Sequence, residues 1–193
     1  MASTSFDQEK FDKIKNIPEM GDAILVATNR PDIISDSIEW FSNGHYSHVA
    51  MYVGGGDNSI IEYTLKGCIK DSLIKYCTKD MRIMIRRVKN LTLDQASKVK
   101  ALAYKDYLEN KPYGFLSYVG YIISSLLRKI GINIMKNDNP FRTHTSEVCS
   151  SGYVKWYKLA GIELLPKIGI DMVTPKHIED CAKMQTLIYV DGE

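Results

Sequence analysis

The chain has 193 residues, of which 45% are hydrophobic and 25% are charged. This balance is typical of a folded globular protein and excludes an intrinsically disordered one. The net charge of +2, without a run of basic residues interleaved with aromatic ones, argues against a nucleic-acid partner. The length suits one domain, which we expect to cover residues 1–193.

The N-terminal segment, MASTSFDQEKFDKIKN, is polar and lacks the apolar stretch of a secretory signal, which favours a cytoplasmic protein with reduced thiols. The four cysteines are Cys68, Cys77, Cys149 and Cys181. They form no CxxC pair and have no zinc-binding spacing, so we expect neither a metal nor another cofactor. A reduced cysteine is available as a nucleophile.

The first half of the chain predicts one short helix and then mostly β-strands. The helix covers residues 7–17, an apolar strand follows at 21–28, and a second helix is expected at 32–43. Further strands are predicted at 48–55, 58–64, 67–73 and 81–88. Glycines 54–56 and Asp57 indicate a hairpin between the first two of these strands.

The second half predicts mainly helices. Residues 92–110 form a helical pattern with Thr92 as the expected N-cap. A helix that contains Cys149 ends at Gly161, and a last helix at 174–181 precedes a last strand at 185–190. This order predicts an α+β fold with a core at about 21–161, to which the terminal elements are appended.

An uncharged apolar stretch at 112–127 has three interpretations. It is a buried core helix, which we favour, a groove for an acyl chain, or a helix that contacts a membrane. The stretch is shorter than the roughly 20 residues that span a bilayer, so we expect no transmembrane segment.

Cys149 is a candidate nucleophile because of its place in its helix. Ser146 is a plausible N-cap, which puts Cys149 in the first turn. The N–H groups and the dipole there stabilise a thiolate, and the same N–H groups can bind an oxyanion. The alternative is an inert buried thiol that only packs.

His48 is the candidate base. In the strand that it begins, the alternate residues from Val49 to Val53 are apolar and are expected to face the core. His48 then lies on the opposite face beside small Ala50, where we expect the Cys149 helix to pack. The alternative is an ordinary surface histidine.

Glu62 is the candidate partner of the base. It and His48 are equidistant from a hairpin centre at residue 55, so the two side chains are expected to lie opposite each other. A carboxylate there would orient the imidazole. The alternative is a solvated strand glutamate, and His45, before the strand, is a weaker candidate base.

Five segments together resemble a known family: GDAILV, SHVAMYV, SIIEYTLKG, KPYGF and VCSSGYVKWYKLAG. They are similar to the circularly permuted papain-like cysteine hydrolases, in the YiiX/YaeF-type branch of the NlpC-like superfamily, which includes relatives of lecithin:retinol acyltransferase. The resemblance covers about residues 21–161. It implies a permuted papain-like fold, in which an antiparallel sheet or small barrel packs against helices and the nucleophile begins a helix.

The resemblance implies roles for individual residues. Cys149 matches the nucleophile, His48 the general base and Glu62 the third polar residue, in the reversed order of the permuted branch. The implied substrate-binding residues are Ser47, Tyr113 and Ser150. Two departures bear on specificity: Val148 replaces an aromatic residue, and the sequence after the cysteine is Ser-Ser-Gly rather than Ser-Glu.

The implied reaction is acyl transfer through a thioester on Cys149. We expect an amidase or peptidase that acts on small peptides, such as cell-wall fragments. The first alternative is a lipid esterase or acyltransferase with the same site. The second is a catalytically silent binding module that keeps the fold.

Overall fold

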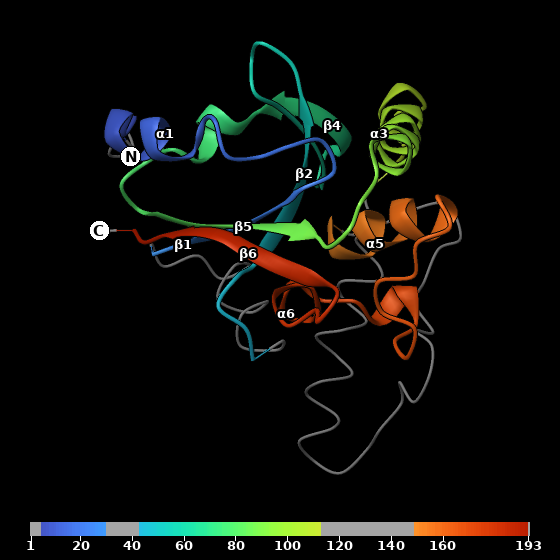
Figure 1. The fold of residues 1–193 in the computed structure, drawn as a ribbon. Helices are drawn as coiled ribbons and strands as arrows, with labels where there is room; N and C mark the ends of the chain where they lie inside the picture. Colours follow the sequence, from blue (N-terminus) through green and yellow to red (C-terminus); the bar gives the residue numbers. More distant parts are fainter. Residues whose placement is uncertain (1–4, 30–42, 113–148, 193) are drawn as a thin grey trace.

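The computed structural model describes residues 5–29, 43–112 and 149–192, which form the predicted α+β fold around one antiparallel sheet (Figure 1). The strands are β1 (Ala23–Thr28), β2 (His48–Gly54), β3 (Ser59–Thr64), β4 (Gly67–Ser72), β5 (Met81–Val88) and β6 (Met184–Val190). Their order across the sheet is β4-β3-β2-β1-β5-β6, so β2 lies inside the sheet between β3 and β1. All the strands predicted within these residues are confirmed.

The described helices are α1 (Gln8–Ile14), α3 (Leu93–Leu108), α5 (Cys149–Leu159), α6 (Pro175–Glu179) and the 3₁₀ turns η1 (Leu73–Tyr76) and η2 (Ile170–Met172). Thr92 caps α3 as predicted, in a capping box with Gln95. The helix expected at 32–43 and the apolar stretch at 112–127 lie outside the described residues. Among the described helices, none combines the length and apolar character needed to cross a bilayer.

The end of α5 follows from a single glycine. Gly161 has a φ of 86°, a conformation in which a Cβ atom is strained, and the N–H of Ile162 donates to the carbonyl of Tyr157 at 2.9 Å. The N–H of Gly161 also donates to Lys158 at 3.0 Å, which completes a Schellman motif. The predicted end of this helix at Gly161 is confirmed.

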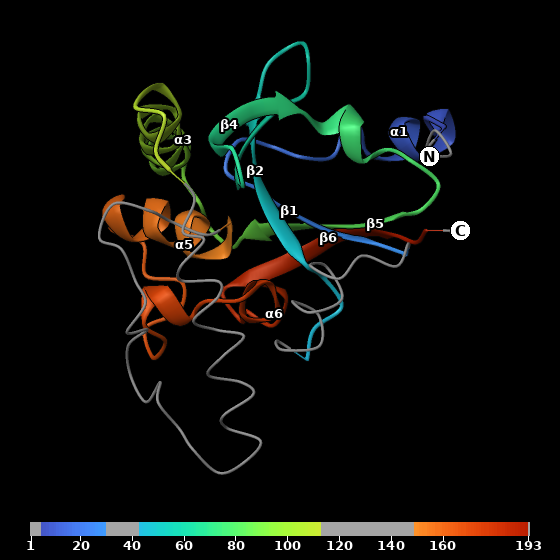
Figure 2. The same ribbon diagram turned by 180° about the vertical axis from the view of Figure 1, so that it is seen from behind.

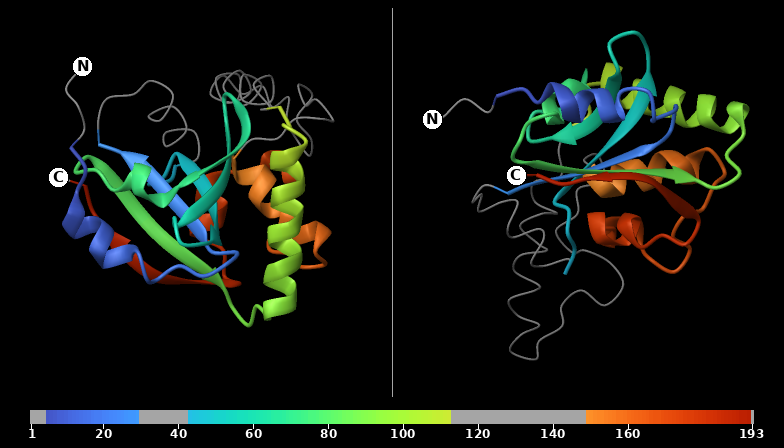
Figure 3. Two further views of the ribbon diagram at one scale, coloured as in Figure 1. Left: turned by 90° about the horizontal axis from the view of Figure 1, so that it is seen from above. Right: turned by 60° about the vertical axis from the view of Figure 1, so that its left-hand side comes forward.

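Both faces of the sheet are covered, and Figure 3 (right view) shows α1 on one side with α5 and α6 on the other. Alternate residues of β2 divide between the two faces. Val49, Met51 and Val53 join the core under α3, α5 and α6, as predicted for this apolar set. Ala50 and Tyr52 join a second core under α1 and η1.

The position of α5 differs from the prediction that it would pack beside Ala50. The large side chains of α5, among them Tyr153 and Trp156, are buried in the same core as Val49. Residues of α1 and η1 already pack on the Ala50 face, so the apolar side chains of α5 are buried on the opposite face. α5 and α3 therefore lie together at one end of the sheet (Figures 1 and 2).

The C-terminal strand is part of the sheet. β6 pairs antiparallel with β5 from Val88↔Met184 to Ile83↔Val190 and forms one edge. The guanidinium of Arg86 in β5 donates to main-chain carbonyls that lead from α6 into β6. These are the carbonyls of Ile178 at 2.8 Å, Cys181 at 3.2 Å, Met184 at 2.9 Å and also Glu179. β6, which the sequence predicted as an appended strand, thus completes the sheet at one edge, and α6 is held to β5 through Arg86.

Candidate active site

Cys149 lies where β2 and β3 separate. Counted from the hairpin, the last pair between these strands is Ala50↔Glu62, so the pairing stops before it reaches Val49. The backbone N–H of Val49 is directed instead at the sulfur of Cys149, and so is the N–H of Ser150. Cys149 is the first residue of α5 and is 6% exposed. The start of the helix therefore enters the opening between the two strands.

His48 contacts both of the other candidate residues. Its ring hydrogen-bonds the thiol group of Cys149, and its Nε2 lies 2.6 Å from Oε2 of Glu62. Because Glu62 engages Nε2, Nδ1 is the ring nitrogen left for the sulfur. The His48 side chain is 23% exposed, whereas that of Glu62 is fully buried. The structure therefore brings Cys149, His48 and Glu62 together.

The contact between His48 and Glu62 is diagonal. The prediction placed them directly opposite each other, but Glu62 pairs with Ala50. The hairpin is centred near residue 56, as the pairs Ala50↔Glu62 and Gly54↔Ser59 show, rather than at the expected residue 55, and a bulge between Tyr52 and Gly54 adds one residue to β2. His48 and Glu62 still share one face of the sheet, and diagonal neighbours with long side chains are within reach of each other.

Glu62 has two further partners that the sequence analysis missed. The Tyr76 hydroxyl donates to Oε2 of Glu62, and the Lys75 ammonium donates to Oε1. Asp71 accepts a second hydrogen bond from Lys75 at 3.0 Å. A usable signal was Ser72, a typical N-cap that starts η1 directly after β4. Nothing in the sequence indicated which face of the sheet η1 would cover.

These contacts favour the charged form of all three residues. Burial raises the pKa of Glu62, but the hydrogen bonds and charges of His48 and Lys75 lower it to about 2. Burial likewise opposes a charged imidazole, yet Cys149 and Glu62 raise the pKa of His48 to about 10. Burial disfavours a thiolate, but the charge and hydrogen bond of His48 and the two N–H groups lower the pKa of Cys149. The arrangement favours a thiolate–imidazolium pair.

The other three cysteines have different surroundings. Burial raises the pKa of Cys68 and of Cys77 to about 12, so both remain protonated thiols. The thiol of Cys181 donates to the carbonyl of Leu164 at 3.6 Å. These are the surroundings of buried thiols that serve packing.

Of the three predicted substrate-binding residues, the structure describes two, Ser47 and Ser150. Ser47 and Ser150 are both buried, and their hydroxyls donate to main-chain carbonyls: that of Ser47 to Val26 at 3.5 Å and that of Ser150 to Val173 at 2.7 Å. Tyr113, the expected N-cap Ser146 and Val148 lie outside the described residues. His45, the weaker candidate base, is exposed and pairs with Glu179 at 2.7 Å.

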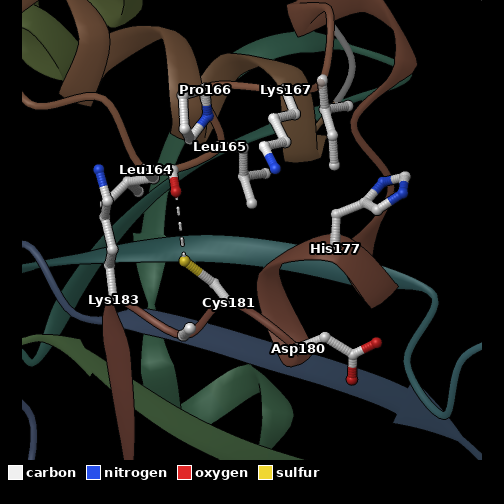
Figure 4. Close-up of a pocket in the computed structure, with 10 residues that line it drawn as sticks. Leu164, Leu165, Pro166, Lys167, His177, Asp180, Cys181 and Lys183 are labelled. Carbon is white, nitrogen blue, oxygen red and sulfur yellow. Dashed lines mark hydrogen bonds between the residues drawn. The ribbon is translucent and has the colours of Figure 1, made fainter.

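Two further observations concern ligands. In the described part of the chain, no group of three or more His, Cys, Asp or Glu side chains is placed to hold a metal ion. A pocket of about 340 Å³ lies between α6 and the segment that follows α5 (Figure 4). Leu164, Leu165, Pro166 and His177 contribute to its lining, which does not include Cys149.

No family model matches the chain, but the chain is similar to a curated protein in sequence and to solved structures in fold. The chain is 28% identical over 152 residues to "Probable lipoprotein peptidase YaeF" of Escherichia coli (strain K12), over 79% of this chain and 52% of that protein. It thus spans about half the length of this curated relative. It has the fold of the metalloprotein YiiX from Escherichia coli O157:H7, with a TM-score of 0.65, 17% identity and coverage of 91% of this chain and 99% of that one.

Proposed function

On the premise of a YiiX/YaeF-type family, which the similarities to YaeF and YiiX support, we propose that this chain is a cysteine hydrolase that acts through a thioester on Cys149. The observation that carries the proposal is the contact of the Cys149 thiol with His48, whose other nitrogen bonds the buried Glu62. His48 and Glu62 precede Cys149 in the chain, which is the order of a circularly permuted papain-like enzyme.

Each residue has a defined part in the proposed reaction. The Cys149 thiolate attacks the carbonyl carbon of an amide, and the tetrahedral oxyanion is bound by N–H groups at the start of α5. The amide C–N bond then breaks, and the leaving nitrogen takes the proton of the His48 imidazolium. Neutral His48 next removes a proton from water, which attacks the thioester carbonyl; the C–S bond breaks, the acid leaves, and the Cys149 thiolate and the His48 imidazolium are restored. Glu62 orients the ring throughout.

An amide or peptide is the preferred substrate, because the curated relative is named a peptidase. A lipid esterase or acyltransferase would use the same three residues with a different leaving group or acceptor. A catalytically silent binding module is disfavoured, because the pKa of Cys149 is lowered by its surroundings rather than raised, as expected for an inert buried thiol. One permuted papain-like domain and a cytoplasmic location remain parts of this proposal.

The test is a substrate screen with detection of the acyl-enzyme. The protein is incubated with short peptides, N-acyl amides or phospholipid vesicles, and acyl adducts on Cys149 are measured by intact mass and peptide mapping. We expect adducts with peptides or amides and none in Cys149→Ala. Glu62→Gln should retain at least about tenfold more activity than Cys149→Ala, because Glu62 only orients the base.

The other outcomes separate the alternatives. An adduct with phospholipids alone would support the lipid esterase or acyltransferase. No adduct with any class, together with slow alkylation of Cys149, would contradict the hydrolase proposal and favour a binding module.

A further inference from the structure

The carboxylate of Glu62 has more partners than orientation of His48 requires. Oε2 accepts hydrogen bonds from His48 and Tyr76, and Oε1 accepts one from Lys75. The Glu62 side chain is fully buried, and Lys75 is 30% exposed. A buried carboxylate is stable only while its charge is balanced by hydrogen bonds and an opposite charge.

The turn that carries Lys75 is firmly attached to the sheet. η1 is anchored by Leu73 and Tyr76, both buried in the core on the Ala50 face. Ser72 caps the turn by accepting the N–H of Ile74 at 3.3 Å. Asp71 of β4 holds the Lys75 ammonium from its other side. The position of Lys75 against Glu62 is thus set by the fold.

The charges around Glu62 change during the proposed reaction. In the resting site, the Cys149 thiolate and the Glu62 carboxylate face the His48 imidazolium and the Lys75 ammonium. When the thioester forms and the leaving group takes the His48 proton, both Cys149 and His48 become neutral. Glu62 then remains charged and buried, and among the described residues Lys75 is the positive group that hydrogen-bonds it.

Building on the proposed function, we propose that Lys75 is a positioning residue that keeps Glu62 charged and in place while His48 is neutral, and so permits His48 to give up its proton. Tyr76 has the complementary part of holding Oε2 at the distance that the His48 ring needs. His48 can then act as a base toward water in the second half of the reaction.

Loss of Lys75 has a definite direction of effect. Without the ammonium, only a protonated His48 would balance the charge of Glu62. Imidazole is more basic than a carboxylate, so a proton shared by this pair stays on His48. Two other charged groups bear on the pair: Asp71 from β4, which acts through Lys75, and Cys149 from α5. Replacing Cys149 removes the thiolate and isolates the effect of Lys75.

The experiment measures the His48 imidazole by NMR titration in the Cys149→Ala protein, whose neutral side chain stands for the neutral sulfur of the thioester. The resonance is assigned by its loss in a His48→Gln version. We expect Lys75→Met to raise the pKa of His48 by roughly one pH unit or more. Lys75→Arg should keep the parent value because it keeps the charge. Lys66→Met, at an exposed lysine of the β3–β4 turn, is the matched control.

An unchanged or lowered pKa of His48 in Lys75→Met would overturn the proposal. Circular dichroism melts verify that each variant is folded, and Lys75→Gln replaces Lys75→Met if the latter is not. The titration needs no catalysis, so its outcome decides the role of Lys75 even if the hydrolase proposal fails.

Kinetics of the Cys149-containing protein provide a second readout, with p-nitrophenyl acetate as the acyl donor. Lys75→Met should retain the burst of p-nitrophenolate, which reports acylation, and slow the steady state, which reports attack of water on the thioester. Lys75→Arg should restore the steady state. A parallel loss of burst and steady state would point to a structural defect and contradict the proposed role.

Discussion

At the scale of single residues, the reactivity of Cys149 is the outcome of opposing effects. Burial of the thiol works against the thiolate, because a charge is poorly solvated inside a protein. The positive His48 ring and the N–H groups of Val49 and Ser150 work in the other direction and prevail. Cys68 and Cys77 are also buried but lack such partners, and their pKa values are raised to about 12.

The first prediction concerns the pH dependence of alkylation by iodoacetamide. Because its pKa is lowered, Cys149 should be alkylated readily between about pH 6 and 8, where an ordinary thiol is mostly protonated. In His48→Gln the rate at pH 7 should fall by about tenfold or more and recover only toward pH 9. Peptide mapping assigns the modified residue, with Cys77 as the internal reference. Identical profiles in the two proteins would mean that His48 does not stabilise the thiolate.

At the scale of elements, α5 is held by a polar and aromatic contact with β3 and α3. The Tyr63 ring of β3 stacks on Trp156 of α5, with ring centroids 5.6 Å apart. The Tyr63 hydroxyl and the Trp156 Nε1–H both donate to Oδ2 of Asp106 in α3, each at 2.8 Å. Lys111 pairs with the other oxygen of Asp106 at 2.5 Å. One buried carboxylate thus joins three elements and fixes the angle of α5.

The close approach of α5 to β3 depends on Gly152. A Cβ atom at this position would lie 2.5 Å from two atoms of the Tyr63 ring, well inside van der Waals contact. We predict that Gly152→Ala lowers the free energy of unfolding by about 1–3 kcal/mol, because the ring is stacked and cannot move away. Urea denaturation measures the change, and Lys158→Ala, at an exposed site of the same helix, is the control. A stability equal to that of the parent protein would show that the helix shifts without cost.

At the scale of the whole molecule, the sheet collects the candidate site from distant parts of the chain. β2 and β3 supply His48 and Glu62, η1 supplies Lys75, and α5 arrives more than eighty residues after β3. Covering both faces of the sheet removes Glu62 from water, so its ionisation becomes coupled to folding. We therefore expect the free energy of unfolding to vary with pH in the range in which Glu62 ionises.

Glu62 has an ordinary pKa of 4.5 when exposed and about 2 in the folded protein. A lowered pKa means that its contribution to stability is complete above about pH 4.5 and is lost as the pH falls toward 2. We predict that the difference in free energy of unfolding between the parent and Glu62→Gln shrinks by about 2 kcal/mol over this range. Urea titrations at several pH values measure it, with Glu163→Gln as an exposed control. A difference that does not vary with pH would contradict the prediction.

Much of the fold was predictable because its signals are local. Alternating side chains in 48–53 indicated the strand and its apolar face, and the caps at Thr92 and Gly161 marked helix ends. The signals for the site were partly local too, since Cys149 begins a helix and His48 shares a face with Glu62. The wrong predictions, the face covered by α5 and the hairpin register, depended on how elements pack and on where the hairpin between β2 and β3 turns.

The sequence by itself determined the types of element, their limits, and which side chains of each strand share a face, because these depend on neighbours a few residues apart. Only the tertiary structure decided that α5 enters between β2 and β3, and that η1 brings Lys75 and Tyr76 to Glu62. Those contacts join residues in separate elements, and their geometry is set by the burial of large apolar side chains such as Trp156 and Leu73. Which helix covers which face of the sheet depends on the apolar area that each helix can bury there. This depends on the whole chain, so no short stretch of sequence predicts it.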